Sequence, residues 1–344
     1  MPVPARVPVP EIFEMSQDSI HYSYSMHPII YTFPESIPII GGASIYSYGV
    51  MLGLAFISAW YLSLHNANHE GFPYKTTVTA FALAIIFALI GARVAHLITN
   101  PSTWRMQGFF RAMFGSKCEG LVAYGGFIGG PLAVWVYIKY VKKADFWSLA
   151  DCAAPGMCMG LGLTRIGCFL AGCCHGKPTD VPWGVVFPEG SQAANAFGYG
   201  IPVHPTQLYE SLVGWAMLPL ALFLYKRRKF TGQTFLIMIS CYAVARFLLE
   251  FIRGDTDRGG FGNHADPALS TSQFIGLVLI VFVIGFYLYR RKHAPAPPEP
   301  LSKEEVHQRL LEAGVIKEKD DKKPKKAPPP KSSPSKKKRK KKKR

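Results

Sequence analysis

Residues 160–177, GLGLTRIGCFLAGCCHGK, place one arginine, Arg165, and a cluster of cysteines at the end of an apolar run. The preceding residues, 146–163, are apolar except for Asp151 and are rich in Gly and Ala. A helix needs about 20 apolar residues to cross the hydrocarbon core of a bilayer. Arg165 would then lie where such a helix leaves the bilayer, either in a functional site or as a side chain that reaches the lipid headgroups.

The composition indicates a membrane protein with a basic tail. The chain has 344 residues, 49% of them apolar, a positive mean hydropathy and a formal net charge of +17. Residues 301–344 hold 18 Lys and Arg against 6 Asp and Glu, which accounts for +12 of that charge. Residues 1–300 therefore carry only +5, and we predict an all-α polytopic membrane protein.

Seven segments are long and apolar enough, or nearly so, to be transmembrane helices. They are residues 45–64, 77–98, 120–138, 146–165, 206–225, 233–252 and 272–289. Basic clusters follow the third, fifth and seventh segments, at 139–143, 226–229 and 290–292. The positive-inside rule places these clusters in the cytoplasm, so the N-terminus faces outward and the C-terminus inward.

Three parts lie outside the predicted seven-helix domain of residues 45–293. Residues 1–44 form an irregular, outward-facing segment without the pattern of a cleaved signal peptide. The proline-rich connection 166–205 is predicted to be a small outward-facing cap. Residues 294–344 form a Pro- and Lys-rich cytoplasmic tail, with a short helix over 303–313 and a disordered basic ending. Because the same chain has seven predicted transmembrane segments, the basic ending indicates attraction to anionic lipid of the inner leaflet rather than to nucleic acid.

Ionisable residues gather in the predicted spans, mostly near their outward ends. They are Arg93, His96, Asp151, Arg165, Glu210, Arg246, Glu250 and Arg253. The last three are spaced i, i+4 and i+7, which predicts an Arg–Glu–Arg ladder on one helical face. The excess of arginine suits an anionic ligand such as phosphate, and a network of structural ion pairs is the alternative. The glycine pairs of YGGFIGGP, residues 124–131, would serve close helix packing or make room for a ligand.

Six motifs together resemble the prolipoprotein diacylglyceryl transferase family, in order and spacing, over about residues 46–290. They are SYGVMLGLAF, GARVAHLI, VAYGGFIGG, LADCAAPGMCMGLGLTRIGCFLAGCCHGK, HPTQLYES and ARFLLEFIRGD. The resemblance implies a seven-helix enzyme of the bacterial inner membrane that needs no cofactor. Such an enzyme transfers diacylglyceryl from phosphatidylglycerol to the lipobox cysteine of a prolipoprotein and releases glycerol phosphate.

The resemblance also implies which residues act. The family's two essential arginines fall on Arg165 and Arg246, and we expect Tyr124 and His204 to take part in catalysis beside them. The residues expected to bind substrate are Arg93, Asp151, Gly125, Gly126, Gly167, Cys168, Gln207, Tyr209, Glu210, Glu250 and Arg253. Displacement of a phosphate by sulfur needs a thiolate, whose parent thiol has a pKa of about 8.5, and positive charge at the leaving group.

Three positions depart from the pattern common in the family. Tyr124 stands where many members have a His proposed as the base, Cys168 stands in place of an Asn, and Cys173 in place of a Glu. The chain therefore resembles the cysteine-containing branch. Tyr124, His175 and His204 are the candidate bases by position, although a tyrosine with a pKa near 10 is a better hydrogen-bond donor than base.

The cysteines between 168 and 174 leave other functions open. Cys168, Cys173, Cys174 and His175 lack the paired C-x2-C spacing of common zinc sites, so the sequence predicts no metal. A disulfide between Cys168 and Cys173, or buried inert thiols, are the other possibilities. The alternative functions are a membrane thiol or redox protein that uses this cluster, and a non-catalytic relative that binds lipid or lipoprotein.

Overall fold

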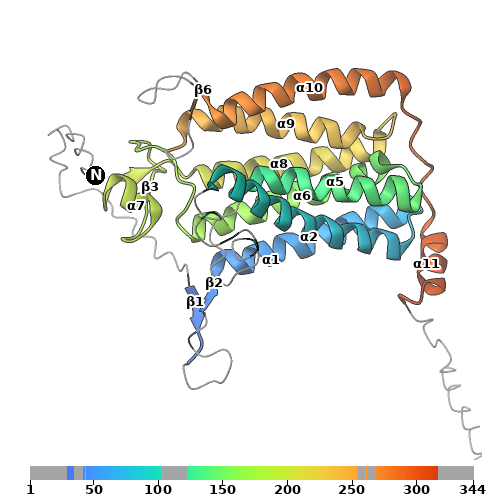
Figure 1. The fold of residues 1–344 in the computed structure, drawn as a ribbon, viewed down its shortest axis with the longest axis horizontal. Helices are drawn as coiled ribbons and strands as arrows, with labels where there is room; N and C mark the ends of the chain where they lie inside the picture. The colour runs from blue at the N-terminus through green and yellow to red at the C-terminus, as the bar shows by residue number, and fades with distance from the viewer. Residues whose placement is uncertain are drawn as a thin grey trace, which may run out of the picture. The chain divides into compact units, whose positions relative to one another are not determined.

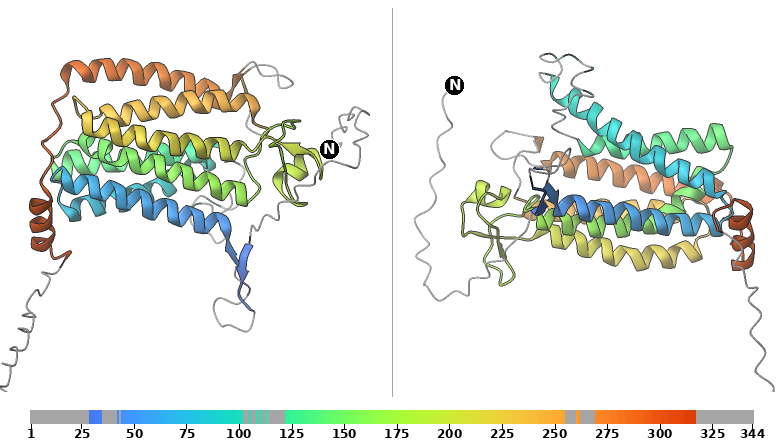
Figure 2. Two further views of the ribbon diagram at one scale, coloured as in Figure 1. Left: turned by 180° about the vertical axis from the view of Figure 1, so that it is seen from behind. Right: turned by 90° about the horizontal axis from the view of Figure 1, so that it is seen from below.

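The computed structural model describes residues 29–34, 42, 44–101, 105, 108, 110, 113, 122–254, 260–261 and 269–316. The chain divides into two compact units, Met1–Leu301 and Ser302–Arg344. Most of the predicted N-terminal segment and the whole basic ending, residues 317–344, lie outside the described residues. The first unit is a bundle of long helices (Figures 1 and 2).

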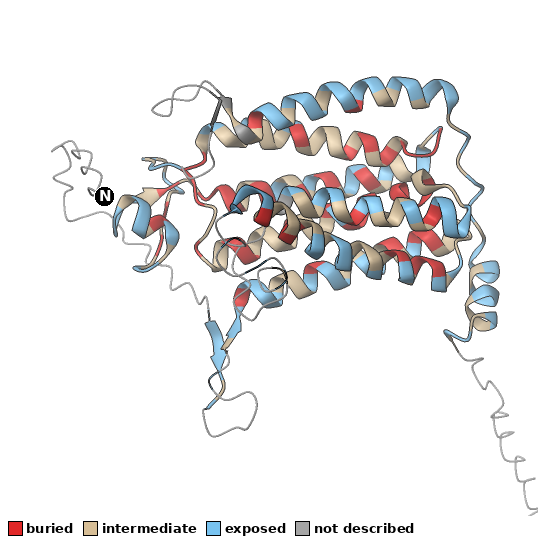
Figure 3. Cartoon of the chain, viewed as in Figure 1, coloured by how far each residue is buried: buried red, intermediate tan, exposed pale blue. Residues whose placement is uncertain are grey.

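Six helices of the described residues have the length and hydropathy to cross a bilayer. They are α1 (Ser47–His69), α2 (Tyr74–Thr99), α6 (Phe146–Leu170), α8 (Thr206–Arg227), α9 (Gln233–Leu249) with its continuation η2 (Glu250–Ile252), and α10 (Thr271–His293). Large apolar side chains such as Ile57, Leu89 and Val281 are exposed. Figure 3 shows exposed residues along the long helices. A surface of this kind is stable against lipid and costly in water, in agreement with the predicted all-α polytopic class.

The third predicted span is the helix α5 (Ala123–Val136), which continues as the π-helix η1 (Tyr137–Lys142). Its glycines lie directly on α2. A Cβ atom added at Gly125 would come within 2.1 Å of the carbonyl oxygen of Gly91, and one at Gly126 within 3.1 Å of the carbonyl oxygen of Ala88. The glycines therefore permit close helix packing. The helix α2 occupies the space on this side of Gly125 and Gly126, and their contact with substrate stays a prediction.

The helix α6 lies at the centre of the bundle, packed against α1, α8 and α9 (Figure 1). Small residues allow these helices to pack closely on α6. A Cβ atom at Gly214 of α8 would meet the backbone nitrogen of Gly162 at 2.7 Å, and one at Gly156 would meet the carbonyl oxygen of Ala59 in α1 at 2.5 Å. The pair α2 and α5 packs mainly on itself, and α10 packs on α9.

Residues 171–205, here called the cap, connect α6 to α8 at one end of the bundle. The predicted cap began at residue 166, but α6 continues to Leu170 because residues 166–170 are still apolar. In the cap the strands β3 (Val185–Val186) and β4 (Pro202–Val203) pair antiparallel beside the short helix α7 (Gln192–Phe197). Their small core contains Val185, Phe187, Ala193 and Val203.

Two further strand pairs lie outside the helices. The strand β1 (Ile29–Thr32) pairs antiparallel with β2 (Ser44–Tyr46), directly before α1, so the described part of the lead-in is more regular than predicted. The strand β5 (Gly260–Phe261) pairs with β6 (Leu269–Ser270) before α10. Both pairs adjoin the bundle at the end where the cap lies (Figure 1).

Residues 294–301, here called the strap, cross the opposite end of the bundle. The amide of Thr231 donates to the carbonyl oxygen of Pro295 at 3.1 Å, and the amide of Leu301 donates to that of His69 at 2.7 Å. The predicted tail began at residue 294, whereas the first unit extends to Leu301. In the second unit the expected short helix is present as α11 (Lys303–Glu312), with a capping box between Ser302 and Glu305.

Candidate functional site

The carboxylate of Glu210 is the centre of a cluster of arginines at the cap end of the bundle. Glu210 lies in the first turns of α8, and its side chain is only 1% exposed. It contacts Arg165 of α6, Arg253 after η2 at 3.0 Å, and Arg246 of α9 at 4.0 Å. Four chain segments are thus joined by one buried acidic side chain. Arg165 is therefore a member of an ion-pair cluster, and the alternative of an arginine that merely reaches the headgroups is wrong.

The ladder predicted for Arg246, Glu250 and Arg253 forms only in part. Arg246 Nη1 contacts Glu250 Oε2 at 2.5 Å, as its i, i+4 spacing predicts. Arg253 does not continue that face, because α9 ends at Leu249 and the chain passes through η2 into an extended conformation. Its backbone instead bridges to Gly176 of the cap, and its side chain pairs with Glu210.

Among the residues that the structure describes, the cluster holds more positive than negative charge. The three guanidinium groups of Arg165, Arg246 and Arg253 face two described carboxylates, those of Glu210 and Glu250. The side chains of Arg165 and Arg246 are 19% and 15% exposed, while that of Arg253 is 3% exposed. Arg165 and Arg246 can therefore present donors to an anion while Arg253 stays fixed in the protein. Planar guanidinium groups bind phosphate oxygens with two parallel hydrogen bonds, in a geometry that ammonium groups cannot match.

A row of polar aromatic residues lies where the cap meets α8. Nε1 of Trp183 donates to the hydroxyl of Tyr209 at 2.7 Å, and that hydroxyl lies 3.3 Å from Nδ1 of His204. The backbone of His204 is held on both sides by Gly176 and Lys177, the segment that also contacts Ile252 and Arg253. The segment of Gly176 and Lys177 therefore lies between His204 and Arg253 of the arginine cluster. The hydroxyl of Tyr209 orients the ring of His204.

The cysteines 168, 173 and 174 come together beside the arginine cluster. Their Sγ atoms all lie within 4.8 Å of one another, and the described cysteines are free thiols. Gln207 donates to the carbonyl oxygen of Cys173 at 2.7 Å, and the hydroxyl of Thr206 donates to that of Cys174 at 2.8 Å. The pKa of Cys174 lies below its ordinary value, because the other two thiols hydrogen-bond to its sulfur and the charges of Arg253 and Arg165 favour the thiolate.

Two predicted residues belong to a different helix group. Arg93 is buried in α2, which packs mainly on α5, and Tyr124 lies at the first turn of α5. The hydroxyl of Tyr124 donates to that of Ser272 at 3.2 Å, and Tyr124 is 42% exposed. Gly167, also predicted to bind substrate, lies against Met51 and Tyr48 of α1. The arginines of the Glu210 cluster and Tyr124 are therefore on separate layers of the bundle.

Asp151 does not belong to the arginine cluster. About 21 Å of helix separates it from Arg165, at a rise of about 1.5 Å per residue. Its carboxylate accepts hydrogen bonds from the amides of Gly232 and Phe235 at 2.8 and 2.9 Å, and lies 3.3 Å from Arg228 Nε. Asp151 therefore anchors the start of α9 at the strap end, and its contact with substrate stays a prediction.

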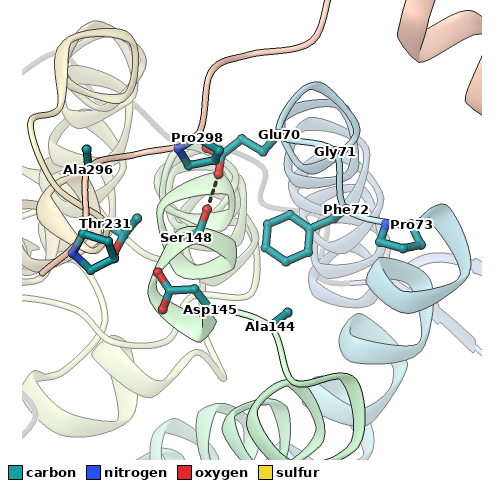
Figure 4. Close-up of a pocket in the computed structure, with 11 residues that line it drawn as sticks. Glu70, Gly71, Phe72, Pro73, Ala144, Asp145, Ser148, Thr231, Ala296 and Pro298 are labelled. Carbon is teal, nitrogen blue, oxygen red and sulfur yellow. Dashed lines mark hydrogen bonds between the residues drawn. The ribbon is translucent and has the colours of Figure 1, made fainter.

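The strap end also has a cavity of about 380 Å³, separate from the arginine cluster. Figure 4 shows Ser148 and Glu70 hydrogen-bonded at its edge, and Pro298 and Ala296 of the strap also line the cavity. Glu70 also pairs with Arg228, so this end has an ion-pair network of its own. The sequence indicates Arg228 only as one of the basic residues 226–229, because nothing in the local pattern connects it with Glu70 or Asp151.

Two further residues at the cap end, Thr206 and Trp183, were not predicted from the sequence. Thr206 adjoins the predicted Gln207 in HPTQLYES, so its position in that motif was a usable signal. Trp183 lies in the cap among prolines, and no local pattern connects it with Tyr209.

Comparison with known proteins agrees with the motifs. The sequence profile of the family described as prolipoprotein diacylglyceryl transferase matches residues 34–289. A phosphatidylglycerol--prolipoprotein diacylglyceryl transferase 2 of Clostridium perfringens is 34% identical over 248 residues, which cover 72% of this chain and 92% of the relative. A phosphatidylglycerol--prolipoprotein diacylglyceryl transferase of Clostridium tetani is 32% identical over 255 residues, 72% of this chain and 93% of the relative. The chain therefore belongs to the prolipoprotein diacylglyceryl transferase family.

Proposed function

We propose that this protein transfers the diacylglyceryl group of phosphatidylglycerol to the lipobox cysteine of prolipoproteins and releases glycerol phosphate. The observation that carries the proposal is the arginine cluster around Glu210, in which Arg165 and Arg246 remain partly exposed. A lipid phosphate is the anion that a site of this charge, at the end of a membrane helix bundle, would meet.

The reaction assigns a role to each group of residues. The substrate thiolate attacks the glyceryl carbon, the bond from that carbon to the phosphate oxygen breaks, and the leaving phosphate gains negative charge. Arg165 and Arg246 stabilise that charge, while Arg253, Glu210 and Glu250 hold the two arginines in place.

The thiol proton also needs an acceptor. His204 takes it through Nε2 when its Nδ1–H donates to Tyr209, whose hydroxyl is fixed by Trp183. Gln207 and Cys168 line the adjoining turn. Tyr124 and Arg93, from the α2 and α5 layer, contact the substrate from the other side, with Tyr124 as a hydrogen-bond donor.

The proposed topology has seven spans. Helix α5 and its continuation η1 together have 20 residues, about 30 Å of helix, and form the third span in chain order, which makes seven with the six other helices. The N-terminus and the cap face outward, and the strap and the tail lie in the cytoplasm of a bacterium, at its inner membrane. The basic ending of the tail binds anionic lipid of the inner leaflet and not nucleic acid.

The orientation can be tested with topology reporters. A reporter fused after Arg228 or at the C-terminus should read as cytoplasmic, because basic residues follow the third, fifth and seventh spans. A reporter inserted at the exposed turn of Gly190 should read as exported. A cytoplasmic signal from position 190 would contradict the orientation and, with it, an outward-facing site.

The activity can be tested with purified full-length protein in micelles that contain phosphatidylglycerol. We expect a lipobox peptide to gain a thioether-linked diacylglyceryl group, with one glycerol phosphate released for each product. The same peptide with Ser in place of its Cys should remain unmodified. Peptide or lipid binding without product would identify a non-catalytic relative, and failure to rescue a conditional transferase mutant would support that outcome.

A further inference from the structure

The turn after α6 gathers three thiols that the proposed mechanism does not require as nucleophiles. Cys168 lies in the last turn of α6, and Cys173 and Cys174 follow it. Cys174 has a φ of 61°, a left-handed conformation that is rare for residues other than glycine. With this conformation both consecutive side chains bring their Sγ atoms to within 4.8 Å of each other and of Cys168. A strained residue of this kind persists only where its surroundings enforce it.

Hydrogen bonds and close packing around the turn hold Cys174 in its left-handed conformation. The carbonyl groups of Cys173 and Cys174 accept hydrogen bonds from Gln207 and Thr206, two buried residues at the start of α8. Gly172 before them has a φ of 67°, and a Cβ atom there would lie 3.0 Å from the Cβ of Ser191. The backbone that positions the sulfur atoms is therefore held from α8 and from the cap, and the three thiols are arranged before any ligand binds.

We propose that Cys168, Cys173 and Cys174 bind one thiophilic divalent cation of the Zn²⁺ type as thiolates. Sulfur ligands at about 2.3 Å from a tetrahedral zinc lie about 3.8 Å apart, so the observed arrangement needs a contraction of at most about 1 Å. A disulfide would use two of the thiols and leave the third without a role. Three thiolates around Zn²⁺ carry one net negative charge, and the positive charges of Arg253 and Arg165 lie near the sulfur of Cys174.

Three protein ligands leave the fourth tetrahedral position open, as in catalytic zinc sites. The next step rests on the proposed function: the thiol of the lipobox cysteine, here called the acceptor thiol, binds at this open position. The thiol loses its proton to His204 and binds the metal as a thiolate. Its sulfur then forms a bond to the glyceryl carbon while the carbon–oxygen bond breaks, and glycerol phosphate leaves with the electron pair. The thioether product is a weaker ligand than a thiolate and dissociates, and no group is oxidised or reduced.

The metal site can be tested without any turnover. Full-length protein is purified in micelles, reduced, freed of metal and titrated with Co²⁺, which takes the place of zinc and reports thiolate ligands by an intense sulfur-to-cobalt charge-transfer band. We expect one Co²⁺ per chain, displaced by Zn²⁺. Cys168→Ser, Cys173→Ser and Cys174→Ser should each lose most of the band. The control Cys241→Ser, from α9 and outside the cluster, should retain it.

Two results would overturn the metal site. One is a reduced wild-type protein that shows no charge-transfer band. The other is a band of equal intensity in the wild type and in all three cluster variants, when thermal melting shows that the variants are folded. Thiols that become available for alkylation only after reduction of the native protein would identify a disulfide and also count against a metal.

The open coordination position is tested on the cobalt-loaded protein without lipid donor. A lipobox peptide with Cys should change the visible cobalt spectrum, and its Ser analogue should not. No change with the Cys peptide would overturn the role of the metal in binding the acceptor. Full transfer activity in chelator-treated, metal-free protein would overturn it too, while the proposed function would stand. Cobalt binding without transfer in any preparation would count against the proposed function and leave the metal site intact.

Discussion

Replacement of Arg165 by Ala should lower the rate of diacylglyceryl transfer about 10²- to 10⁴-fold. Hydrogen bonds to charged groups contribute roughly 1.5–3 kcal/mol each, and two of them lost in the transition state give a factor of this size. Arg165→Lys should be almost as defective, because an ammonium group cannot form the two parallel hydrogen bonds of a guanidinium group. The lysine would also leave Glu210 with an altered partner.

The measurement is product formation on a lipobox peptide with phosphatidylglycerol as donor, at substrate concentrations that separate kcat from KM. A loss confined to the transition state lowers kcat and kcat/KM together. Arg227→Lys is the matched control, because Arg227 is exposed at the strap end and its guanidinium lies over the ring of Phe223. Near-normal activity of Arg165→Lys would show that Arg165 does not bind the phosphate through a two-bond contact.

Replacement of Glu210 by Ala should destabilise the folded protein by about 3–5 kcal/mol. Removal of one partner from a buried ion-pair cluster leaves the other charges less compensated. Here Glu250 would be the remaining carboxylate, among the described residues, beside Arg165, Arg246 and Arg253. Glu210→Gln should cost less than Ala, because the amide oxygen can still accept the hydrogen bond from Arg253.

The stability change is measured as the shift of the unfolding transition in denaturant, in the same micelles for every variant. Glu189→Ala is the control: Glu189 is an exposed residue of the cap, and its loss should change stability by less than about 0.5 kcal/mol. A Glu210→Ala protein as stable as the Glu189→Ala protein would show that the three arginines are solvated without Glu210, and that the cluster is not a structural unit.

Local sequence patterns predicted the features of this protein that lie within a single continuous segment, namely its helices, one ion pair and its motifs. Apolar runs predicted the six helices that, within the described part of the chain, have the length and hydropathy of spans, because a helix in lipid must satisfy its backbone internally and present apolar side chains. The i, i+4 spacing predicted the ion pair of Arg246 and Glu250. The helix α11 was predicted from the sequence as a short helix over residues 303–313. The motifs identified the family for the same reason, since each motif is a short continuous stretch.

The contacts between segments were decided only by the tertiary structure. Glu210 joins three arginines from separate parts of the chain, and the turn at Cys174 brings three thiols together through hydrogen bonds from α8. Asp151 shares a helix with Arg165 yet lies about 21 Å from it, and Gly125 packs on α2. The sequence alone determined the helices, the membrane class and the family. The pairing of buried charges depends on which helix faces pack together, and that information is absent from the pattern of any single segment.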